Sequence, residues 1–498
     1  MRILLIAPPV NSFTGLLKRG YPLGLCMLAA VAKEEKVDSV AVYDVDKCHA
    51  VTYGLDFTHQ RENMDAYLHG INNSQHPVWK EIEAKLVEHR PDLVGITTMT
   101  IDYASALRVA EIVKRWNPYC LVVMGGAQAS VMPRAMIEWP FTDAIVRGEG
   151  EEAFRGIIRK IGSGSTALGQ IPGVVTKSSM EKCDAPPVEI KNIDELPFAD
   201  RESLLNPENY SPEDMGLMLT SRGCPFRCSY CSNFTIKTRF RSVEQVIDEI
   251  QGVQKAYGTF QFMFKDDSFT VNRRRVSKFC QVIKKKNIRI AWESTTRLDL
   301  VDDALVTEMK SAGCNRVGVG VESGDDGILQ VLNKRLTKDQ IRRSTTILDK
   351  NRLFWTGYFM MGLPMETEPQ MLATLEFMKE LKPPYAALGI YKPYPGTKLF
   401  EFAEQSGLVT KDVGNEHFLH TNPVDYFLID PRRRSRVVSA EKLEAMAAMM
   451  EREFDRSNKR ITNVLKRASS RRLLYARHPR SLVTDVMRFV KWRSSNSA

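Results

Sequence analysis

The stretch Ser221-Arg-Gly-Cys224-Pro-Phe-Arg-Cys228-Ser-Tyr-Cys231 places three of the chain's nine cysteines within eight residues. A loop with thiols at positions i, i+4 and i+7 can ligate three irons of a [4Fe–4S] cluster and leave the fourth iron open to a small molecule. Zinc is the main alternative, but a structural zinc site takes four protein ligands. No histidine lies between His89 and His417, and the next cysteine along the chain is Cys280, so a local fourth ligand is absent.

The cysteine motif stands near the start of a series of strand-like segments, each followed by a segment of helical periodicity. The segments are 216–221, 260–264, 288–293, 316–321, 355–361 and 386–391. This alternation predicts a partial (β/α)6 barrel, in which functional residues gather at the carboxyl ends of parallel strands. Polar residues and turn residues do follow these segments, among them Asp266, Arg297, Glu322, Gly362 and Pro364.

The first 160 residues also alternate between strand-like and helical segments. Strands are predicted at 2–7, 39–44, 93–98, 120–124 and 143–146, and amphipathic helices at 23–33 and 103–116. This order predicts a doubly wound, Rossmann-like α/β domain whose ligands bind at the carboxyl ends of the strands. Neither GxGxxG nor a P-loop GK[ST] is present, which argues against a nucleotide-binding domain.

The charge of the chain is concentrated at one end. Of the net +10 of the 498 residues, residues 431–498 carry +12 and the remainder −2. A general nucleic-acid-binding role is therefore not expected, whereas an interaction through the basic tail stays open. The sequence contains no apolar run of 18 residues and no secretion signal, so a cytoplasmic protein with reduced cysteines is expected.

The cysteine motif resembles the signature of the radical S-adenosylmethionine (SAM) superfamily, CxxxCxxC with an aromatic residue before the last cysteine. Further likeness lies in Phe264-Lys-Asp-Asp-Ser-Phe269, Trp292-Glu-Ser-Thr-Thr-Arg297, Gly318-Val-Gly-Val-Glu-Ser-Gly324 and residues 357–364, although the GGE form of many members is absent. The resemblance implies a catalytic [4Fe–4S] cluster on Cys224, Cys228 and Cys231. It implies SAM contacts from Tyr230, Asp266, Arg297, Glu322, Gly362 and Pro364.

Two of these residues, taken singly, also have an ordinary structural explanation. Glu322 fits a helix cap, and Arg297 fits an ion pair with a core carboxylate. Their positions at successive predicted strand ends after the cluster motif favour contact with SAM. The resemblance implies that Glu322 binds the ribose and that the segment ending at Pro364 lies against the adenine.

The N-terminal region resembles the cobalamin-binding domain that precedes the radical SAM barrel in one large subgroup. The likeness rests on Pro22-Leu-Gly-Leu25, Val94-Gly-Ile-Thr-Thr-Met99, Met124-Gly-Gly-Ala-Gln-Ala-Ser130 and Val146-Arg-Gly-Glu-Gly-Glu151. Adjacent glycines at a strand end let the backbone approach a large flat ligand, and small polar side chains suit its amide periphery. The resemblance implies cobalamin contacts from Thr98, Met99, Gly125, Gly126, Ala127, Gly148 and Glu149.

The chain departs from many cobalamin-binding domains in lacking their DxHxxG motif, whose histidine ligates cobalt from below. The first predicted strand is followed by Asn11-Ser-Phe-Thr-Gly-Leu-Leu-Lys18, without histidine. His49 follows the second strand, where a surface role is the more common one. Cobalamin is therefore expected in the base-off form, without a protein nitrogen on cobalt.

The resemblance implies that a 5′-deoxyadenosyl radical removes a hydrogen atom from the substrate, and that a methyl group from methylcobalamin is added to an unactivated carbon. Cyclisation, ring contraction or rearrangement with the same cofactors stays an alternative. So does a non-catalytic cobalamin or redox sensor. A methylthiotransferase is disfavoured because no additional N-terminal cysteine cluster is present. The expected partners are a small-molecule or lipid substrate and an electron donor such as a flavodoxin or ferredoxin.

The predicted organisation is a cobalamin-binding domain at 1–165, a linker at 166–212, a radical SAM barrel at 213–410 and a basic, mainly helical region at 411–498. Residues 407–430 are expected to form an irregular connection, and 441–454 is predicted to be a helix. A basic amphipathic helix over 471–493 could contact a membrane surface or close the barrel. Four barrel-mouth residues could line the substrate site or belong to the core: Tyr358, Met360, Tyr391 and Tyr394.

Overall fold

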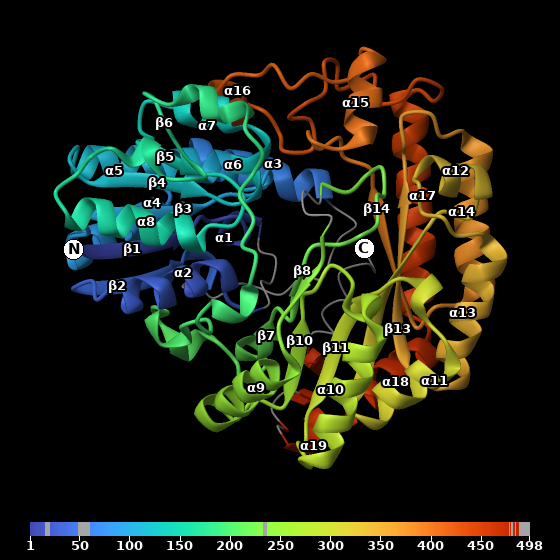
Figure 1. The fold of residues 1–498 in the computed structure, drawn as a ribbon. Coiled ribbons are helices and arrows are strands. Elements are labelled where there is room, and N and C mark those ends of the chain that lie inside the picture. The colour runs from blue at the N-terminus through green and yellow to red at the C-terminus, as the bar shows by residue number, and fades with distance from the viewer. Residues whose placement is uncertain are drawn as a thin grey trace. The chain divides into compact units, whose positions relative to one another are not determined.

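The computed structural model describes residues 1–14, 20–47, 60–232, 237–477, 479, 482–483 and 485–487. The chain forms two compact α/β units (Figure 1). The first comprises Met1–Met215 and Lys411–Tyr426, and the second comprises Gly216–Thr410 and Phe427–Ala498. Residues 166–212, expected to be a linker, thus lie within the first unit.

The first unit is built on a six-stranded sheet of order β2-β1-β3-β4-β5-β6. The strands are β1 (Arg2–Ala7), β2 (Ser39–Asp44), β3 (Leu93–Thr97), β4 (Leu121–Gly125), β5 (Ala144–Val146) and β6 (Val174–Thr176). The first five run parallel, and β6 pairs antiparallel with β5. The near-continuous apolar runs of β1 and β3 are buried, as expected for strands covered on both faces.

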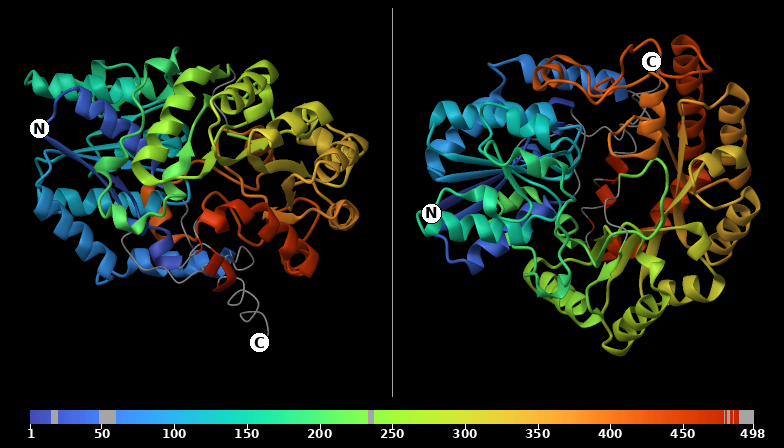
Figure 2. Two further views of the ribbon diagram at one scale, coloured as in Figure 1. Left: turned by 90° about the horizontal axis from the view of Figure 1, so that it is seen from below. Right: turned by 45° about the horizontal axis from the view of Figure 1, so that its top comes forward.

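Helices cover both faces of this sheet (Figure 2). They are α1 (Asn11–Thr14), α2 (Leu23–Glu34), α3 (Gln60–Asn72), α4 (Pro77–His89), α5 (Tyr103–Trp116), α6 (Ala127–Val131), α7 (Pro133–Glu138), α8 (Glu151–Gly162) and α16 (Asn415–His420). α2 packs with α8, while α5 packs with α3, α4 and α16. The doubly wound arrangement predicted from the sequence is therefore confirmed. α16 lies within 407–430, where only irregular chain was expected.

The second unit contains a six-stranded, all-parallel sheet of order β14-β13-β12-β11-β10-β7. The strands are β7 (Leu217–Met218), β10 (Gln261–Phe264), β11 (Ala291–Thr296), β12 (Cys314–Glu322), β13 (Phe354–Met361) and β14 (Tyr385–Ile390). A separate antiparallel pair joins β8 (Ser221–Arg222) and β9 (Arg239–Phe240). The partial (β/α)6 barrel is confirmed. The segment predicted at 216–221 is divided between β7 and β8, and the strand predicted at 288–293 begins only at Ala291.

Helices of the second unit follow the strands and pack around the sheet (Figure 1). They are α9 (Val243–Tyr257), α10 (Arg273–Lys285), α11 (Asp303–Ser311), α12 (Asp326–Val331), α13 (Lys338–Lys350), α14 (Glu368–Leu381), α15 (Lys398–Gln405), α17 (Ala440–Asn458), α18 (Ile461–Ser470) and α19 (Arg472–Arg477). Four buried aromatic residues fill the space between α10 and the sheet. The ring centroids of Phe264, Phe269, Phe279 and Trp292 lie 5.2–6.0 Å apart, and such contacts add to the stabilisation from burial.

The C-terminal region closes one edge of this sheet. α17, which contains the helix predicted at 441–454, packs on the edge strand β14. The side-chain amide of Asn458 accepts a hydrogen bond from the Ala386 N–H and donates one to the Ala386 carbonyl, both at 2.8 Å. Two backbone groups on the open edge of the sheet are thereby hydrogen-bonded. None of the described helices is long and apolar enough to cross a bilayer.

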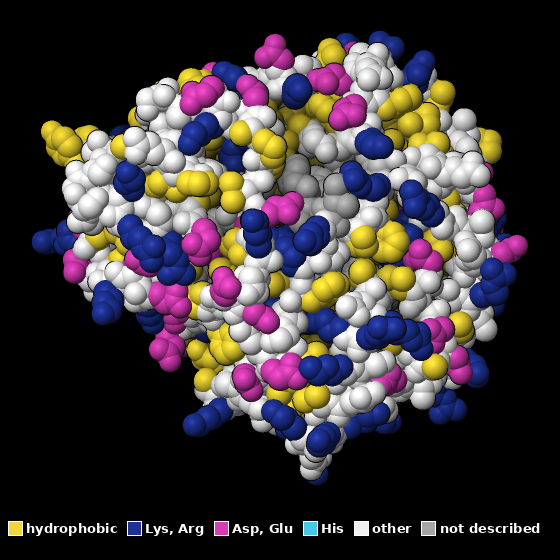
Figure 3. All heavy atoms as spheres, viewed as in Figure 1, with side chains coloured by type: hydrophobic (Ala, Val, Ile, Leu, Met, Phe, Trp, Pro, Cys, Tyr) yellow, Lys and Arg dark blue, Asp and Glu magenta, His cyan; other side chains and the backbone are white. Residues whose placement is uncertain are grey.

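The basic amphipathic helix predicted over 471–493 is only partly described, as α19 and short helical pieces up to Met487. The predicted basic and apolar residues Arg480, Arg488, Phe489, Val490, Lys491 and Arg493 lie outside the described residues, as does His49. On the face drawn in Figure 3, the basic and acidic side chains of the described residues are interspersed.

Candidate functional site

The cysteine loop leaves β8 at Gly223, whose positive φ of 88° favours glycine. Ser229 anchors the middle of the loop: its N–H donates to the Leu332 carbonyl at 3.0 Å and its hydroxyl to the Val331 carbonyl at 2.8 Å. Both acceptors lie at the end of α12. The Ser229 carbonyl in turn accepts from the Leu399 N–H at 3.0 Å. The backbone of the loop is therefore held in place between α12 and α15.

The three cysteines of this loop differ in their exposure. Cys224 and Cys228 are partly buried and Cys231 is exposed, and burial raises the pKa of the Cys224 thiol. Among the described residues, no group of three His, Cys, Asp or Glu side chains converges on a single metal-ion position. Each cysteine of a [4Fe–4S] cluster ligates a different iron, so this donor set does not need one convergence point. Three soft thiols without a fourth local ligand fit such a cluster better than they fit zinc.

Arg297 lies directly behind the cysteine loop. One guanidinium nitrogen is 3.6 Å from the Cys228 sulfur, and the guanidinium carbon lies 3.8 Å from the ring centroid of Phe226. Asp299 accepts two hydrogen bonds from the guanidinium at 3.0 Å each. Burial by itself would lower the pKa of Arg297, but the pair with Asp299 raises it above its ordinary value. The structure thus provides a fixed positive charge beside one thiol.

Glu322 forms a buried polar cluster with Lys334 and Tyr230. Its Oε1 accepts from Lys334 Nζ at 2.7 Å and from the Tyr230 hydroxyl at 2.8 Å, and Lys334 Nζ is 3.2 Å from that hydroxyl. Burial and the neighbouring Glu322 charge raise the pKa of Tyr230 well above its ordinary value. The cluster links the last turn of the cysteine loop to the end of β12.

Backbone strain accompanies this cluster. Glu322 has φ +68°, in the left-handed region that is unfavourable for a non-glycine residue, and the β12–β13 register shifts between Gly320 and Glu322. A Cβ at Gly320 would lie 2.1 Å from Glu322 Oε1 and 2.5 Å from Lys334 Nζ. Gly320 therefore leaves the space in which the carboxylate and the ammonium group meet.

Asp266 has its carboxylate turned towards the strand that precedes the cysteine loop. It accepts hydrogen bonds from the Thr220 N–H at 2.7 Å, the Ser221 hydroxyl at 2.7 Å and the Thr220 hydroxyl. The side chain is almost fully buried. In this arrangement, Asp266 fixes the start of β8 and has no oxygen facing an open site.

The predicted adenine segment turns at Gly362, whose φ is +80°. Glu366, which is fully buried, accepts hydrogen bonds at Oε2 from the N–H groups of Gly362 (2.7 Å) and Leu363 (3.1 Å), whereas its Oε1 has no partner among the described residues. Burial raises the pKa of Glu366 to about 7. Pro364 follows the turn, and its carbonyl accepts from the Arg436 N–H at 2.8 Å.

The first unit holds a narrow cavity of about 150 Å³ beside the carboxyl half of its sheet. Its lining consists of Leu5, Gly24, Leu25, Leu28, Gly95, Ile96, Thr97, Val123, Gly125, Gly126, Val146, Gly148, Gly150, Glu151 and Phe154. A Cβ at Gly24 would meet no atom within 4 Å, and one at Gly125 none closer than 3.8 Å. Side chains at these positions would fill the cavity instead of clashing with its walls. The glycines therefore keep a space open that suits a flat heterocycle and is too small for a whole corrin ring.

Hydrogen bonds tie together the loops that follow β3, β4 and β5. The Thr98 hydroxyl and N–H both donate to the Gly125 carbonyl at 2.7 Å, and the Gly148 N–H donates to the Ser130 hydroxyl at 2.8 Å. A Cβ at Gly126 would lie 2.5 Å from the Thr98 carbonyl oxygen, so the two loops approach each other at a glycine with φ +105°. The carboxyl edge of the sheet is thus held rigidly.

The structure separates the predicted cobalamin residues into two groups. Gly125, Gly126 and Gly148 line the cavity. Four others do not: Thr98 is bonded internally, Met99 is 53% exposed, Ala127 is exposed at the start of α6, and Glu149 accepts from the Ile190 N–H at 2.6 Å. Gly24, Gly95 and Gly150 belong to the lining and were within the quoted motifs, but they were not predicted as contacts.

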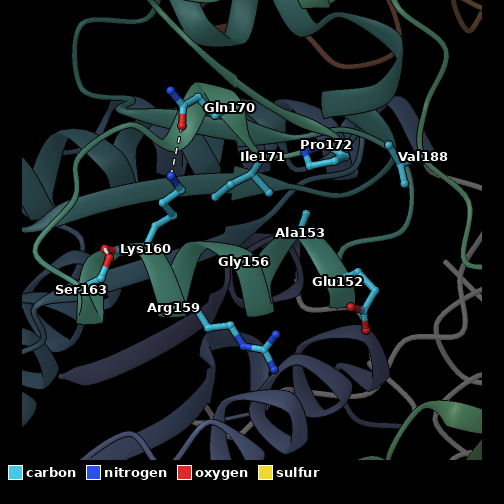
Figure 4. Close-up of a pocket in the computed structure, with 10 residues that line it drawn as sticks. All are labelled: Glu152, Ala153, Gly156, Arg159, Lys160, Ser163, Gln170, Ile171, Pro172 and Val188. Atoms are coloured by element: carbon cyan, nitrogen blue, oxygen red, sulfur yellow. Dashed lines mark hydrogen bonds between the residues drawn. The ribbon is translucent and has the colours of Figure 1, made fainter.

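A second, wider groove of about 720 Å³ runs along the outer side of α8. Figure 4 shows Lys160 of α8 reaching across to Gln170, a hydrogen bond of 3.0 Å. Arg159 makes two hydrogen bonds of 2.8 Å to Glu35. The charged groups of this groove are therefore already paired, and it contains none of the predicted site residues.

Comparison with known proteins connects both units to established families. The Radical SAM superfamily profile matches residues 218–378 and the B12 binding domain profile matches residues 16–158. An uncharacterized methyltransferase of Pyrococcus horikoshii, PH0819, is 32% identical over 458 residues, 90% of each chain. The anaerobic magnesium-protoporphyrin IX monomethyl ester cyclase of Rubrivivax gelatinosus is 29% identical over 334 residues, 64% of this chain and 60% of the cyclase.

A solved structure shows the same fold. The radical SAM methyltransferase TsrM of Kitasatospora setae, with cobalamin and a [4Fe–4S] cluster bound, superposes with a TM-score of 0.61 at 18% identity, covering 85% of this chain and 84% of TsrM. The chain therefore belongs to the radical SAM enzymes that carry a B12-binding domain. This confirms the predicted enzyme class and its cofactors: a [4Fe–4S] cluster, SAM and cobalamin.

Several residues that contact the candidate SAM residues were not predicted from the sequence. Lys334 pairs with Glu322, while Asp299 and Phe226 contact Arg297. Glu366 fixes the turn at Gly362. For Asp299 a signal was available, because it stands two residues after Arg297. Lys334 carried no local signal, since it stands twelve residues after Glu322 beyond α12.

Proposed function

We propose that this enzyme methylates an unactivated carbon of its substrate. The observation that carries the proposal is the similarity over 90% of the chain to a protein named as a methyltransferase. The residue arrangement of the second unit supports it, because Arg297 and the Tyr230–Glu322–Lys334 cluster lie beside the cysteine loop. When bound, the reduced cluster and SAM would supply the radical that removes a hydrogen atom, and cobalamin would supply the methyl group.

In this proposal the residues of the second unit position SAM. Cys224, Cys228 and Cys231 would hold the cluster, and Glu322 would accept hydrogen bonds from the ribose hydroxyls, its orientation being fixed by Lys334. The Gly362–Pro364 turn would lie against the adenine. Asp266 and Arg297 would act mainly as positioning residues, because their polar groups are already engaged with Thr220, Ser221 and Asp299.

The first unit would hold cobalamin in the base-off form. The glycine-lined cavity fits the detached heterocyclic base of the cofactor, whose insertion requires the absence of side chains at Gly24, Gly125 and Gly150. Gly126, Ala127 and Met99 are exposed at the same edge, where the corrin would lie. The chain offers no histidine in the segment after β1, so a protein nitrogen below cobalt is not part of the proposal.

Cyclisation or another radical rearrangement is the second candidate, and the similarity to magnesium-protoporphyrin ester cyclases favours it. The two reactions consume SAM differently. Methyl transfer uses one SAM for hydrogen abstraction and one as the methyl source, and so yields 5′-deoxyadenosine and S-adenosylhomocysteine together. A rearrangement yields 5′-deoxyadenosine without S-adenosylhomocysteine.

The test is an anaerobic incubation of the holoenzyme with a reduced flavodoxin or ferredoxin, trideuteriomethyl-labelled SAM and fractionated small molecules and lipids from cells. We expect both nucleoside products in nearly equal amounts, and a product that carries one trideuteriomethyl group. 5′-Deoxyadenosine alone, with an unlabelled new product, would establish the alternative. Absence of both nucleosides over all fractions would contradict the enzymatic proposal.

We further propose that the C-terminal helices contact an anionic bilayer surface. Seven of the sixteen large apolar residues found exposed in the described chain lie between residues 461 and 487: Ile461, Leu465, Leu473, Leu482, Val483, Val486 and Met487, at 42–64% exposure. Lys466, Arg472 and Arg477 are exposed among them. Exposed apolar groups beside cations match the chemistry of a headgroup region with anionic lipids.

Vesicle co-sedimentation tests this surface. We expect the full-length enzyme to bind vesicles that contain phosphatidylglycerol, and to bind phosphatidylcholine vesicles at least about tenfold more weakly. The triple variant Leu465→Ser, Leu473→Ser, Val486→Ser should lose the binding, whereas Val87→Ser, which alters an exposed apolar residue of α4, should retain it. Equal binding by the triple variant, or sedimentation without vesicles, would contradict a membrane surface and point to another protein surface or a second copy.

A further inference from the structure

The guanidinium group of Arg297 makes one contact that the positioning of SAM does not explain. Its Nη1 donates a hydrogen bond to the Cys228 sulfur, with 3.6 Å between the two atoms. Only 6% of the Arg297 surface is exposed, so water neither competes strongly for this contact nor screens the charge as it would at the surface. One thiol of the cysteine loop therefore faces a buried cation that is also a hydrogen-bond donor.

The other nitrogens of this guanidinium are held by fixed partners. Nε and Nη2 donate to the two carboxylate oxygens of Asp299 at 3.0 Å each, and Nη2 also donates to the Lys334 carbonyl. The ring centroid of Phe226, a residue of the cysteine loop, lies 3.8 Å from the guanidinium carbon. The N–H donors of a guanidinium lie in one rigid plane. With one edge fixed on Asp299, Nη1 is the nitrogen that remains for the sulfur.

Asp299 balances the charge of Arg297 but does not cancel its effect on the sulfur. The carboxylate binds the edge formed by Nε and Nη2, whereas the sulfur contacts Nη1. The ion pair thus presents its positive side to Cys228. The Asp299 side chain is 26% exposed and that of Arg297 7%, so solvent screens the carboxylate more than the guanidinium. The nearer and less screened charge dominates the potential at the sulfur.

We propose that Arg297 raises the reduction potential of the [4Fe–4S] cluster through its hydrogen bond to Cys228. This inference rests on the proposed function, because it takes Cys224, Cys228 and Cys231 as the ligands of the cluster. One-electron reduction adds a negative charge to the cluster and its sulfur ligands. A positive charge and a hydrogen-bond donor at one of these sulfurs stabilise the reduced form more than the oxidised form.

The effect concerns the entry of the electron that cleaves SAM. A reduced flavodoxin or ferredoxin gives up one electron, and the oxidised cluster takes it up. A higher potential of the cluster makes this transfer more favourable, so that a larger fraction of the enzyme is reduced at a given state of the donor. Arg297 would act on this step through Cys228, without touching the substrate.

The test is a redox titration of the reconstituted enzyme, followed by electron paramagnetic resonance of the reduced cluster in the absence of SAM and substrate. For Arg297→Met, which removes the charge and the donor, we expect the equilibrium constant for reduction to fall about tenfold, which is about 59 mV for a one-electron couple. Arg297→Lys keeps the charge without the planar donor edge and should give a smaller fall. Arg342→Met, which removes an arginine of α13 that is 39% exposed, should leave the potential unchanged.

A second measurement uses the unsubstituted enzyme. Arginine labelled with ¹⁵N in its guanidinium group is incorporated during expression, and hyperfine spectroscopy of the reduced cluster detects a nitrogen that is hydrogen-bonded to a ligand sulfur. We expect one ¹⁵N coupling in the wild-type enzyme. The coupling should be absent from Arg297→Lys and present in Arg342→Met.

Each outcome has a defined meaning. An unchanged potential in Arg297→Met with a full complement of iron would overturn the inference, and weaker SAM binding by the same variant would then identify Arg297 as a ligand of SAM. If the variant binds too little iron to be titrated, the ¹⁵N coupling of the wild-type enzyme decides, and its absence overturns the inference. A wild-type protein that assembles no cluster would contradict the assignment of the cysteines as well. A failed methyl-transfer assay beside a lowered potential would count against the proposed reaction alone.

Discussion

Replacing Cys228 by Ala is expected to remove the [4Fe–4S] cluster and to reduce 5′-deoxyadenosine formation below detection. The sequence supplies only three local thiols, so the variant retains two ligands for a cluster that needs three. The loss should also leave Arg297 without the thiol that lies 3.6 Å from its guanidinium nitrogen. Iron content, the visible absorption of the reconstituted protein and nucleoside analysis by liquid chromatography measure the effect.

Cys280→Ala is the matched control for this variant. Cys280 is a buried thiol of α10 that packs in the core, and its removal should cost about 1 kcal/mol of stability without affecting iron content. The assignment of the cluster would be wrong if the Cys228→Ala protein bound a full complement of iron. Equal loss of iron in both variants would mean that general destabilisation, and not a missing ligand, caused the effect.

Local signals in the sequence were sufficient for the fold and for placing the candidate site residues at strand ends. The cysteine spacing needs no tertiary information, and Glu322 and Gly362 could be placed because they directly follow recognisable strands. The ends of strands were less certain. β11 begins at Ala291 and not at 288, because the Ile288 N–H still donates to the Ile283 carbonyl at the end of α10.

Features that depend on packing between distant elements could not be predicted. The cavity of the first unit is lined by Gly24 of α2 and by Gly150, which precedes α8. These two glycines are far apart in the sequence, and only the order of the strands in the sheet brings them together. Asp266 lies at a strand end, as predicted, but its carboxylate accepts hydrogen bonds from the hydroxyls of Thr220 and Ser221 on a different strand segment. The orientation of a polar side chain at a strand end depends on neighbours that the periodicity of its own strand does not reveal.

Replacing Lys334 by Met is expected to lower the free energy of unfolding by about 3 kcal/mol, because it leaves the Glu322 carboxylate buried without its cation. Both side chains are less than a tenth exposed and their charged atoms are 2.7 Å apart. Methionine keeps most of the volume of the lysine stem, so the effect reports the lost charge. We also expect the Kd for SAM to rise about tenfold, since Glu322 would lose the contact that orients it. Chemical denaturation and equilibrium dialysis measure the two effects.

A double variant separates the structural role of Lys334 from its role in positioning Glu322. Lys334→Met with Glu322→Gln removes both charges, so it should recover most of the lost stability. It should not recover SAM affinity, because the amide cannot replace the carboxylate as an acceptor for both ribose hydroxyls. Lys350→Met, which breaks an exposed pair with Asp303, should change stability by less than about 1 kcal/mol. If the double variant regained both stability and SAM affinity, Lys334 would serve only to neutralise a buried charge, and Glu322 would not be the ribose ligand.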